Sequence, residues 1–282
     1  MSSPDITWSY PSQDWARALV GAHVWAARLD LAPVAQANFF ASLDSQERQR
    51  ATRFAFERDR NRFVAGRGLL RAILARYLQM NPAEVELAYG PHGKPALAGL
   101  AATSGLRFNL AHSEDLALLV ATRAAMVGVD VERIRPLPDM LDLVARFFSK
   151  RESARFASLR TEEQPAAFFN LWTRKEAWLK ATGEGIVHSL NRVEVSFVPG
   201  EPARLVSLPG QETNAWALHN LAPAPGFAAA LAIVANNGRL ECWRWPDDEP
   251  ATVLVDPKLA GDALRSGGFT ELHSTERAFR NP

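Results

Sequence analysis

Apolar and polar positions in the first third of the chain change from a strand pattern to a helical one. Residues 22–30 alternate loosely, which predicts an opening strand. Residues 44–80 carry apolar side chains at helical spacing, with many arginines between them. This pattern predicts two helices or one long broken helix, and Asn81-Pro82 ends it.

The pattern then returns to short strands. Residues 85–89 predict a strand, and residues 90–95, which contain two glycines and two prolines, predict a turn. Residues 106–110 and 116–122 predict a hairpin that is joined across residues 111–115.

The second half of the chain repeats this order. Residues 151–182 are helical by pattern and are followed by Gly183 and Gly185. Residues 189–197 predict a strand, and residues 226–235 predict a strand of small side chains, each resembling its counterpart in the first half. The repeat predicts an α+β fold with two related halves and a ligand site in the cleft between them. We expect an N-terminal half over 1–125, a C-terminal half over 126–246 and a peripheral extension over 247–282.

Composition narrows the class of protein. The chain has 282 residues and a formal net charge of only +1, which argues against a generic nucleic-acid binder. The longest apolar run, residues 226–235, is about half of what a membrane-spanning helix needs. The N-terminus lacks the layout of a signal peptide, and a single cysteine, Cys242, excludes an intrachain disulfide and a Cys-cluster metal site. We therefore expect a cytoplasmic protein that binds neither nucleic acid nor membrane.

Lysine is scarce. Of the 32 basic residues only five are lysine, and the rest are arginine. Because the two cations differ in shape and hydration, the lysines point to positions where arginine would not serve. They are Lys94, Lys150, Lys175, Lys180 and Lys258.

Acidic residues form the first candidate site. If residues 127–132 are a strand, its three valines share one face and Asp130 and Glu132 project together from the other. Two adjacent carboxylates repel unless a cation lies between them, and oxygen ligands suit Mg²⁺. The alternative is a strand end whose acids lie in water.

A second candidate lies on the predicted helix over 151–182. Trp172, Glu176 and Lys180 share one helix face, so Glu176 is placed to bind a metal or act as a general base, and Lys180 to hold a phosphate. The alternative is an ordinary surface pair of Glu and Lys.

Further candidates are polar or basic. Asn109, His112 and Ser113 lie in the connection between two predicted strands, where they are suited to bind phosphate. The alternative is a plain hairpin turn. A basic group suits phosphate as well, although a solvated helix face explains most of its arginines. Its members are Arg48, Arg50, Arg53, Arg62, Arg67, His92 and Lys94.

The order of these motifs resembles the 4′-phosphopantetheinyl transferase superfamily in its long, single-chain Sfp type. The motifs are GKP, NLAHS, VGVDVE, FFSKRE and LWTRKEAWLKATGEGI, and the resemblance spans roughly residues 22–200. It implies a monomeric pseudodimer whose two α+β halves are related by a pseudo-twofold axis. It also implies Mg²⁺-dependent transfer of the 4′-phosphopantetheine arm of coenzyme A to a serine of an apo acyl or peptidyl carrier protein, with release of adenosine 3′,5′-bisphosphate.

The resemblance also implies residue roles. Asp130, Glu132 and Glu176 match the metal-binding acids, Glu176 also matches the base, and Lys180 matches the lysine at the pyrophosphate. The implied contacts to coenzyme A are Arg50, Arg67, His92, Lys94, Asn109, His112 and Lys180. The sequence departs from some relatives at three positions, where they have Lys, Thr and Ser. These are Glu47, Phe63 and Ala111.

Two other functions remain open at this point. One is a protein on the same fold that binds coenzyme A or a carrier protein without turnover, and the other is a Mg²⁺-dependent phosphohydrolase that uses the same acids.

Overall fold

The computed structural model describes residues 6–12, 14–90, 93–124, 126–183, 190–210, 212–234 and 239–246. His92, Gly185 and the predicted extension over 247–282 lie outside the described residues, and so does part of the strand predicted over 189–197.

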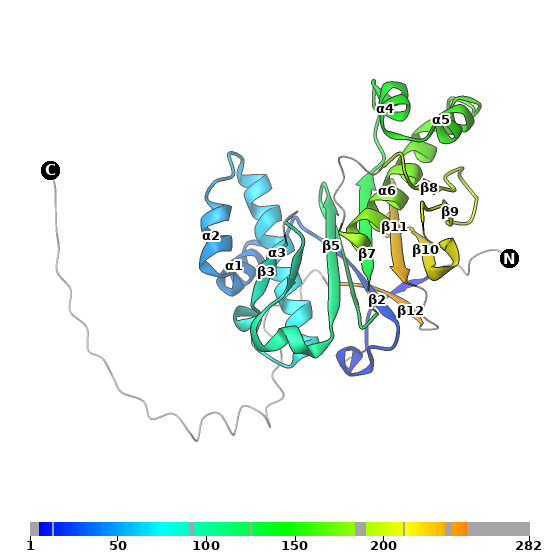
Figure 1. The fold of residues 1–282 in the computed structure, drawn as a ribbon. Coiled ribbons are helices and arrows are strands. Elements are labelled where there is room, and N and C mark those ends of the chain that lie inside the picture. The colour runs from blue at the N-terminus through cyan, green and yellow to red at the C-terminus, as the bar shows by residue number, and fades with distance from the viewer. Residues whose placement is uncertain are drawn as a thin grey trace, which may run out of the picture.

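Each half of the chain is built around a three-stranded antiparallel unit and one long helix (Figure 1). In the first half, β6 (Leu116–Thr122) lies between β2 (Ala22–Arg28) and β5 (Arg107–Ser113), and the helix is α3 (Glu57–Leu78). In the second half, β11 (Phe227–Val234) lies between β7 (Val127–Arg133) and β10 (Trp216–Leu221), and the helix is α6 (Gln164–Thr182). The same order of elements therefore occurs twice along the chain, which confirms the predicted α+β fold with two similar halves.

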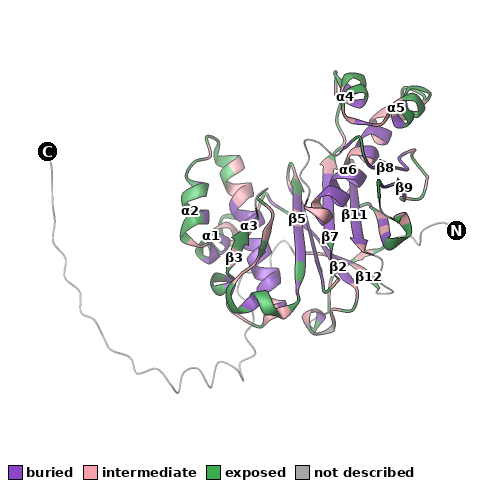
Figure 2. Cartoon of the chain, viewed as in Figure 1, coloured by how far each residue is buried: buried purple, intermediate pink, exposed green. Residues whose placement is uncertain are grey.

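Shorter elements surround the two units. The outer helices are α1, α2, α4 and α5, and they are mostly exposed (Figure 2). The bounds of these helices and of the shorter strands are β1 (Trp8–Ser9), α1 (Pro33–Ser42), α2 (Ser45–Ala51), β3 (Leu87–Tyr89), β4 (Pro95–Leu97), α4 (Met140–Phe147), α5 (Lys150–Ala157), β8 (Glu194–Val195), β9 (Leu205–Ser207) and β12 (Leu240–Arg244).

The structure corrects the helix predictions in two ways and confirms one alternative. The segment predicted as helical over 151–182 is two helices, because the chain turns between α5 and α6 and Pro165 opens α6, where a missing backbone N–H costs nothing. Helices α1 and α4 do not appear in the sequence prediction. The segment over 44–80 is two helices, α2 and α3, as one of the two alternatives predicts.

Two strand predictions also change. Strand β5 runs on to Ser113, which pairs with Leu116, so only Glu114 and Asp115 form the turn. His112 and Ser113 therefore belong to a strand rather than to a loop. In the second half, β8 keeps only two residues of the strand predicted over 189–197.

The last described strand, β12, returns to the sheet of the first half. It pairs in parallel with β2, and β1 pairs in parallel with β12. Trp243 of β12 and Trp245 beyond it pack against Trp25, and Trp15 and Tyr77 complete this aromatic cluster. The predicted boundaries at 125 and 246 stay predictions.

The two halves share an apolar layer. One core lies under α3, a second surrounds α6, and a third joins the sheets through side chains such as Val24, Leu118, Val129 and Leu231. Figure 2 shows this buried interior as the purple strands β5, β7 and β11. In the described part of the chain, no helix is long and apolar enough to cross a membrane.

Candidate active site

Strand β7 carries two acids on its helix-facing side. Val127, Val129 and Val131 enter the core between the halves, as the alternating pattern predicts. Asp130 and Glu132 project from the opposite face, against which α6 packs. Asp130 is buried and Glu132, at the strand end, is partly exposed.

Gly128 allows α6 to lie unusually close to this strand. A Cβ atom at position 128 would stand 2.1 Å from the carbonyl oxygen of Ala177 and 2.4 Å from the backbone nitrogen of Ala181. Both atoms belong to the helix backbone, so no side-chain movement would relieve the overlap. No role was predicted for Gly128, although a glycine inside a valine-rich strand is a signal of close backbone approach.

The predicted pair on α6 reaches the acids of β7. Nζ of Lys180 donates a hydrogen bond of 2.5 Å to Oδ1 of Asp130. Glu176, one helical turn earlier, is 2% exposed. The predicted alternatives, a surface pair on the helix and a solvated strand end, are therefore wrong for Glu176, Lys180 and Asp130, because the helix face that carries them is turned toward β7.

Burial and crowding of charge shift the acid–base properties of the site. Burial raises the pKa of Asp130 to about 6, with Lys180 opposing the rise and Glu132 adding to it. Burial also raises the pKa of Glu176 to about 7, and the charge of Asp130 adds to this rise. For Lys180, burial favours the neutral form, but the surrounding carboxylates outweigh it and its pKa is raised.

The acids retain unused ligand atoms. Oδ2 of Asp130 and Oε1 of Glu176 are buried and accept no hydrogen bond from the described residues. Buried polar atoms are normally satisfied, so each of these oxygens calls for an additional partner. Within the described ranges, no three His, Cys, Asp or Glu side chains are already gathered at the spacing of a metal site.

Two side chains of strand β5, in the first half, make hydrogen bonds with β7 of the second half. Oδ1 of Asn109 accepts a hydrogen bond of 2.8 Å from the backbone N–H of Val129. Oγ of Ser113 donates to Oε2 of Glu132 at 2.7 Å and accepts from the backbone N–H of Arg133 at 3.1 Å. Asn109, predicted to contact coenzyme A, is thus buried at the junction of the two halves.

His112 and Lys94 bring basic side chains to the same region. The pKa of His112 is lowered by the protein around its ring and by the charges of Lys180 and Arg62. Nζ of Lys94 donates to the backbone carbonyls of Lys180 and Ala181, so a cation caps the C-terminus of α6.

A cleft of about 330 Å³ opens between the halves beside this helix end. Lys94, Leu97 and Phe108 line it from the first half, and Met126 and Ala181 line it from the second. The acids themselves do not line it, but Ala181 directly follows Lys180. A ligand in this cleft would therefore lie beside the C-terminal end of α6.

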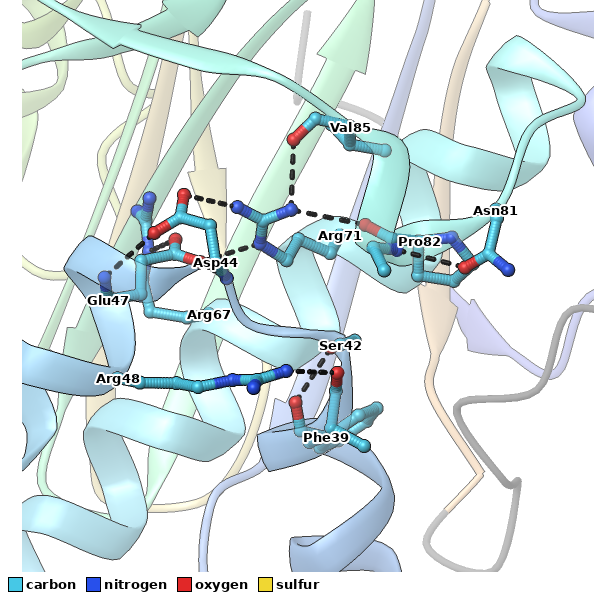
Figure 3. A network of polar contacts seen from close by, with 12 residues as sticks. Phe39, Ser42, Asp44, Glu47, Arg48, Arg67, Arg71, Asn81, Pro82 and Val85 are labelled. Carbon is cyan, nitrogen blue, oxygen red and sulfur yellow. Dashed lines mark hydrogen bonds and ion pairs between the residues drawn. The ribbon is translucent and has the colours of Figure 1, made fainter. Parts of the chain in front are cut away.

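Arg67, predicted to contact coenzyme A, lies in a buried ion network (Figure 3). Its Nε donates to Oε1 of Glu47 at 2.6 Å, and its guanidinium also reaches the hydroxyl of Tyr89. Oε2 of Glu47 accepts from Arg71 at 2.6 Å, and Arg71 is bound to Asp44 as well. This network ties α2 and α3 to the strand that leads into the turn before Lys94.

Glu47 and Phe63, two of the positions at which the sequence departs from some relatives, each contact an arginine in the structure. Glu47 neutralises Arg67, and the Arg50 guanidinium lies over the Phe63 ring at 5.2 Å. Arg50 is exposed. Each departure thus contacts an arginine that the resemblance assigns to coenzyme A.

Lys175 is fully buried and serves the structure around α6. Its Nζ donates to Oε2 of Glu152 at 2.5 Å and to the carbonyl of Leu190 at 2.7 Å. Oε1 of Glu152 accepts from the backbone N–H of Val195. The ion pair joins α5, α6 and β8. Both residues lie in the motifs that carry the resemblance, but local sequence does not show that they pair.

Among the described residues, the first half has no comparable acidic site. The side chains of β2 that face α3 are His23, Trp25 and Ala27, and the tryptophans of the aromatic cluster fill the space around them. Nδ1 of His23 lies 2.7 Å from the Tyr77 hydroxyl. Within the described residues, only the second half therefore presents acids between its first strand and its long helix.

Comparison with known proteins places this site in a family. A model of the 4′-phosphopantetheinyl transferase superfamily matches residues 126–232, and a model of the N-terminal part of 4′-phosphopantetheinyl transferases matches residues 33–124. The 4′-phosphopantetheinyl transferase HetI of Nostoc sp. is 41% identical over 223 residues, which cover 79% of this chain and 92% of HetI. The chain belongs to the 4′-phosphopantetheinyl transferase superfamily.

More distant members of the superfamily match as well. 4′-Phosphopantetheinyl transferase Sfp of Bacillus subtilis is 27% identical over 157 residues, 56% of this chain and 67% of Sfp. The L-aminoadipate-semialdehyde dehydrogenase-phosphopantetheinyl transferase of Mus musculus is 29% identical over 212 residues, 70% of this chain and 69% of the mouse protein. The predicted long type and the predicted enzyme class, a phosphopantetheinyl transferase that uses coenzyme A, are confirmed.

Proposed function

We propose that this transferase moves the 4′-phosphopantetheine arm of coenzyme A to a serine of an apo acyl or peptidyl carrier protein through Asp130, Glu132, Glu176 and Lys180. The observation that carries the proposal is the convergence of these side chains between β7 and α6, with the Lys180–Asp130 contact at 2.5 Å. Family membership supports the reaction, and the geometry supports the roles of the residues.

Glu176 is suited to accept the proton of the carrier serine. Its pKa, raised to about 7 chiefly by burial, is matched to proton transfer at neutral pH. Lys180 is suited to neutralise charge on the departing adenosine bisphosphate, because its ammonium is at the site and its raised pKa keeps it protonated. The serine oxygen then forms the new bond to the phosphorus of the phosphopantetheine arm, and the pyrophosphate bond of coenzyme A breaks.

The acids also fit a divalent cation. The unpartnered oxygens of Asp130 and Glu176, together with Glu132, form an oxygen-only donor set, which Mg²⁺ prefers. Mg²⁺ held there would neutralise charge on the pyrophosphate. Lys180 donates to the other oxygen of Asp130, Oδ1.

We propose that coenzyme A lies in the cleft between the halves. Lys94, His112, Arg50 and His92 remain the proposed basic contacts, and Lys180 holds the pyrophosphate end. For Arg67 we propose a structural role instead, because Glu47 and Tyr89 already occupy its guanidinium. A monomeric state and a cytoplasmic location stay predictions.

The decisive experiment measures transfer directly. Purified protein, Mg²⁺, coenzyme A and a panel of apo carrier proteins should give a carrier whose mass rises by one phosphopantetheine arm. Glu176→Gln should abolish this gain in a folded protein, and Glu212→Gln, at an exposed acid in the same half, should leave it unchanged.

Three results would contradict the proposal. Absence of a mass gain with every carrier, together with tight coenzyme A binding in calorimetry, would indicate a binding protein. Release of inorganic phosphate without a carrier would indicate a phosphohydrolase. Full activity of Glu176→Gln would remove Glu176 from the mechanism.

A further inference from the structure

The edge of β7 that faces the first half lacks a strand partner. In the described sheets, β7 pairs with β11 on one side, and β5 belongs to the other sheet. The bonds from Ile134 N–H to the Gly226 carbonyl and from Val234 N–H to the Met126 carbonyl fix the ladder. They leave the backbone N–H groups of the odd-numbered residues of β7 pointing toward β5.

Side chains of β5 satisfy two of these exposed edge groups. The N–H of Val129 donates to Asn109, and the N–H of Arg133 donates to Ser113. Asn109 and Ser113 are four residues apart on β5, the same spacing as their partners on β7. The two strands are therefore held in one register by side chains rather than by a backbone ladder.

Ser113 differs from Asn109 because it also holds a candidate metal ligand. Its single hydroxyl accepts from the backbone N–H of Arg133 and donates to Oε2 of Glu132. Glu132 stands at the end of β7 and is partly exposed, so its long side chain has rotamers that point into solvent. Of the three acids, Glu132 is the one whose carboxylate a described side chain of the other half holds.

We propose that Ser113 is a positioning residue for Glu132, and that the first half of the chain thereby orients a carboxylate of the second half for a divalent cation. The hydroxyl links Glu132 to the backbone of its own strand, which fixes the direction of the carboxylate. This inference rests on the proposed function of the three acids.

The test compares isosteric variants. Ser113→Thr keeps a hydroxyl, and Ser113→Val has nearly the same shape without one. With Mn²⁺ as the probe and coenzyme A present, electron paramagnetic resonance of free Mn²⁺ gives the metal affinity. We expect Ser113→Val and Ser113→Ala to bind Mn²⁺ about tenfold or more weakly, and Ser113→Thr to approach the wild-type affinity. The Mg²⁺ concentration for half-maximal transfer should shift by the same factor, with kcat at saturating Mg²⁺ largely retained.

A matched control separates positioning from stability. Ser42 is buried, and its hydroxyl donates to the carbonyl of Phe39 at 2.7 Å, within the first half. Ser42→Ala should lower thermal stability and leave Mn²⁺ affinity unchanged. Wild-type Mn²⁺ affinity in Ser113→Val, or equal weakening in Ser113→Thr and Ser113→Val, would overturn the inference. Failure of the wild-type protein to transfer phosphopantetheine would instead overturn the proposed function.

Discussion

Substitution of Gly128 tests whether catalysis depends on the close approach of α6 to β7. In Gly128→Ala the new methyl group would stand 2.1 Å from the Ala177 carbonyl oxygen and 2.9 Å from the carbonyl carbon of Lys180. Ordinary van der Waals separation is greater than 3 Å, so the helix must move away by about 1 Å. Overpacking of this kind costs about 1–3 kcal/mol of stability.

The shift of α6 should reduce the transfer rate far more than it reduces the stability of the fold. Glu176 and Lys180 move with α6 while Asp130 and Glu132 stay on β7, so the distances across the site change. A misplacement of about 1 Å can lower the rate about 100-fold. We expect a folded Gly128→Ala protein with kcat reduced by about that factor, measured by mass spectrometry of the carrier at saturating Mg²⁺ and coenzyme A.

Two glycines of α3 provide matched controls. A Cβ atom at Gly68 would stand 2.3 Å from Cβ of Phe39, so Gly68→Ala should lose similar stability in thermal unfolding yet keep its kcat. At Gly66 the nearest atom would lie 3.9 Å away, so Gly66→Ala should gain about 0.5–1 kcal/mol. If Gly128→Ala keeps both wild-type stability and wild-type kcat, or if Gly68→Ala loses as much activity, the reasoning is refuted.

Three further predictions concern the charged residues of α6. The pKa of Glu176 is raised from 4.5, its ordinary value in an unfolded chain, to about 7 in the folded protein. The folded protein therefore loses stability relative to the unfolded chain as the pH rises through that window. In metal-free urea titrations Glu176→Gln should therefore be more stable than wild type by up to about 3 kcal/mol at pH 8. This difference in stability should vanish near pH 4.5, and a difference independent of pH would contradict the prediction. Lys175→Met should lower the free energy of unfolding by about 3–5 kcal/mol in the same assay, because it leaves Glu152 buried without its cation. The double variant with Glu152→Gln should recover part of this loss, and additive losses would argue against a coupled pair. Lys180→Arg should lower kcat at least about tenfold, because a planar guanidinium does not replace a compact ammonium 2.5 Å from Asp130, and unchanged turnover would show that any cation suffices there.

The sequence predictions and the structure agree most closely where the predictions depended on the local periodicity of apolar and polar residues. Alternation over 127–132 placed Asp130 and Glu132 on the face opposite the valines, and helical spacing placed Glu176 and Lys180 one turn apart. The repeat of a helix followed by strands predicted two similar halves. Each of these inferences uses residues that are neighbours in the chain, whose relative directions the backbone geometry determines.

Contacts between distant segments could not be obtained in this way. Asn109 and Arg67 have the residue types of ligand contacts, but the fold buries them against Val129 and Glu47. His112 and Ser113 were expected in a loop, but the strand pairing of β5 extends through them. A side chain's partner depends on which sheet edge and which helix face meet it, and local sequence does not specify that.

By itself, the sequence predicted which side chains would carry the chemistry: the acids of β7 with Glu176 and Lys180 of α6, in a chain with only five lysines. The tertiary structure alone decided how they act together. Gly128 lets α6 approach β7 closely enough to join the two pairs, and Ser113 reaches across from the other half to hold Glu132. The physical reason is that periodicity fixes the direction of a side chain relative to its own element, whereas only packing fixes the distance between elements.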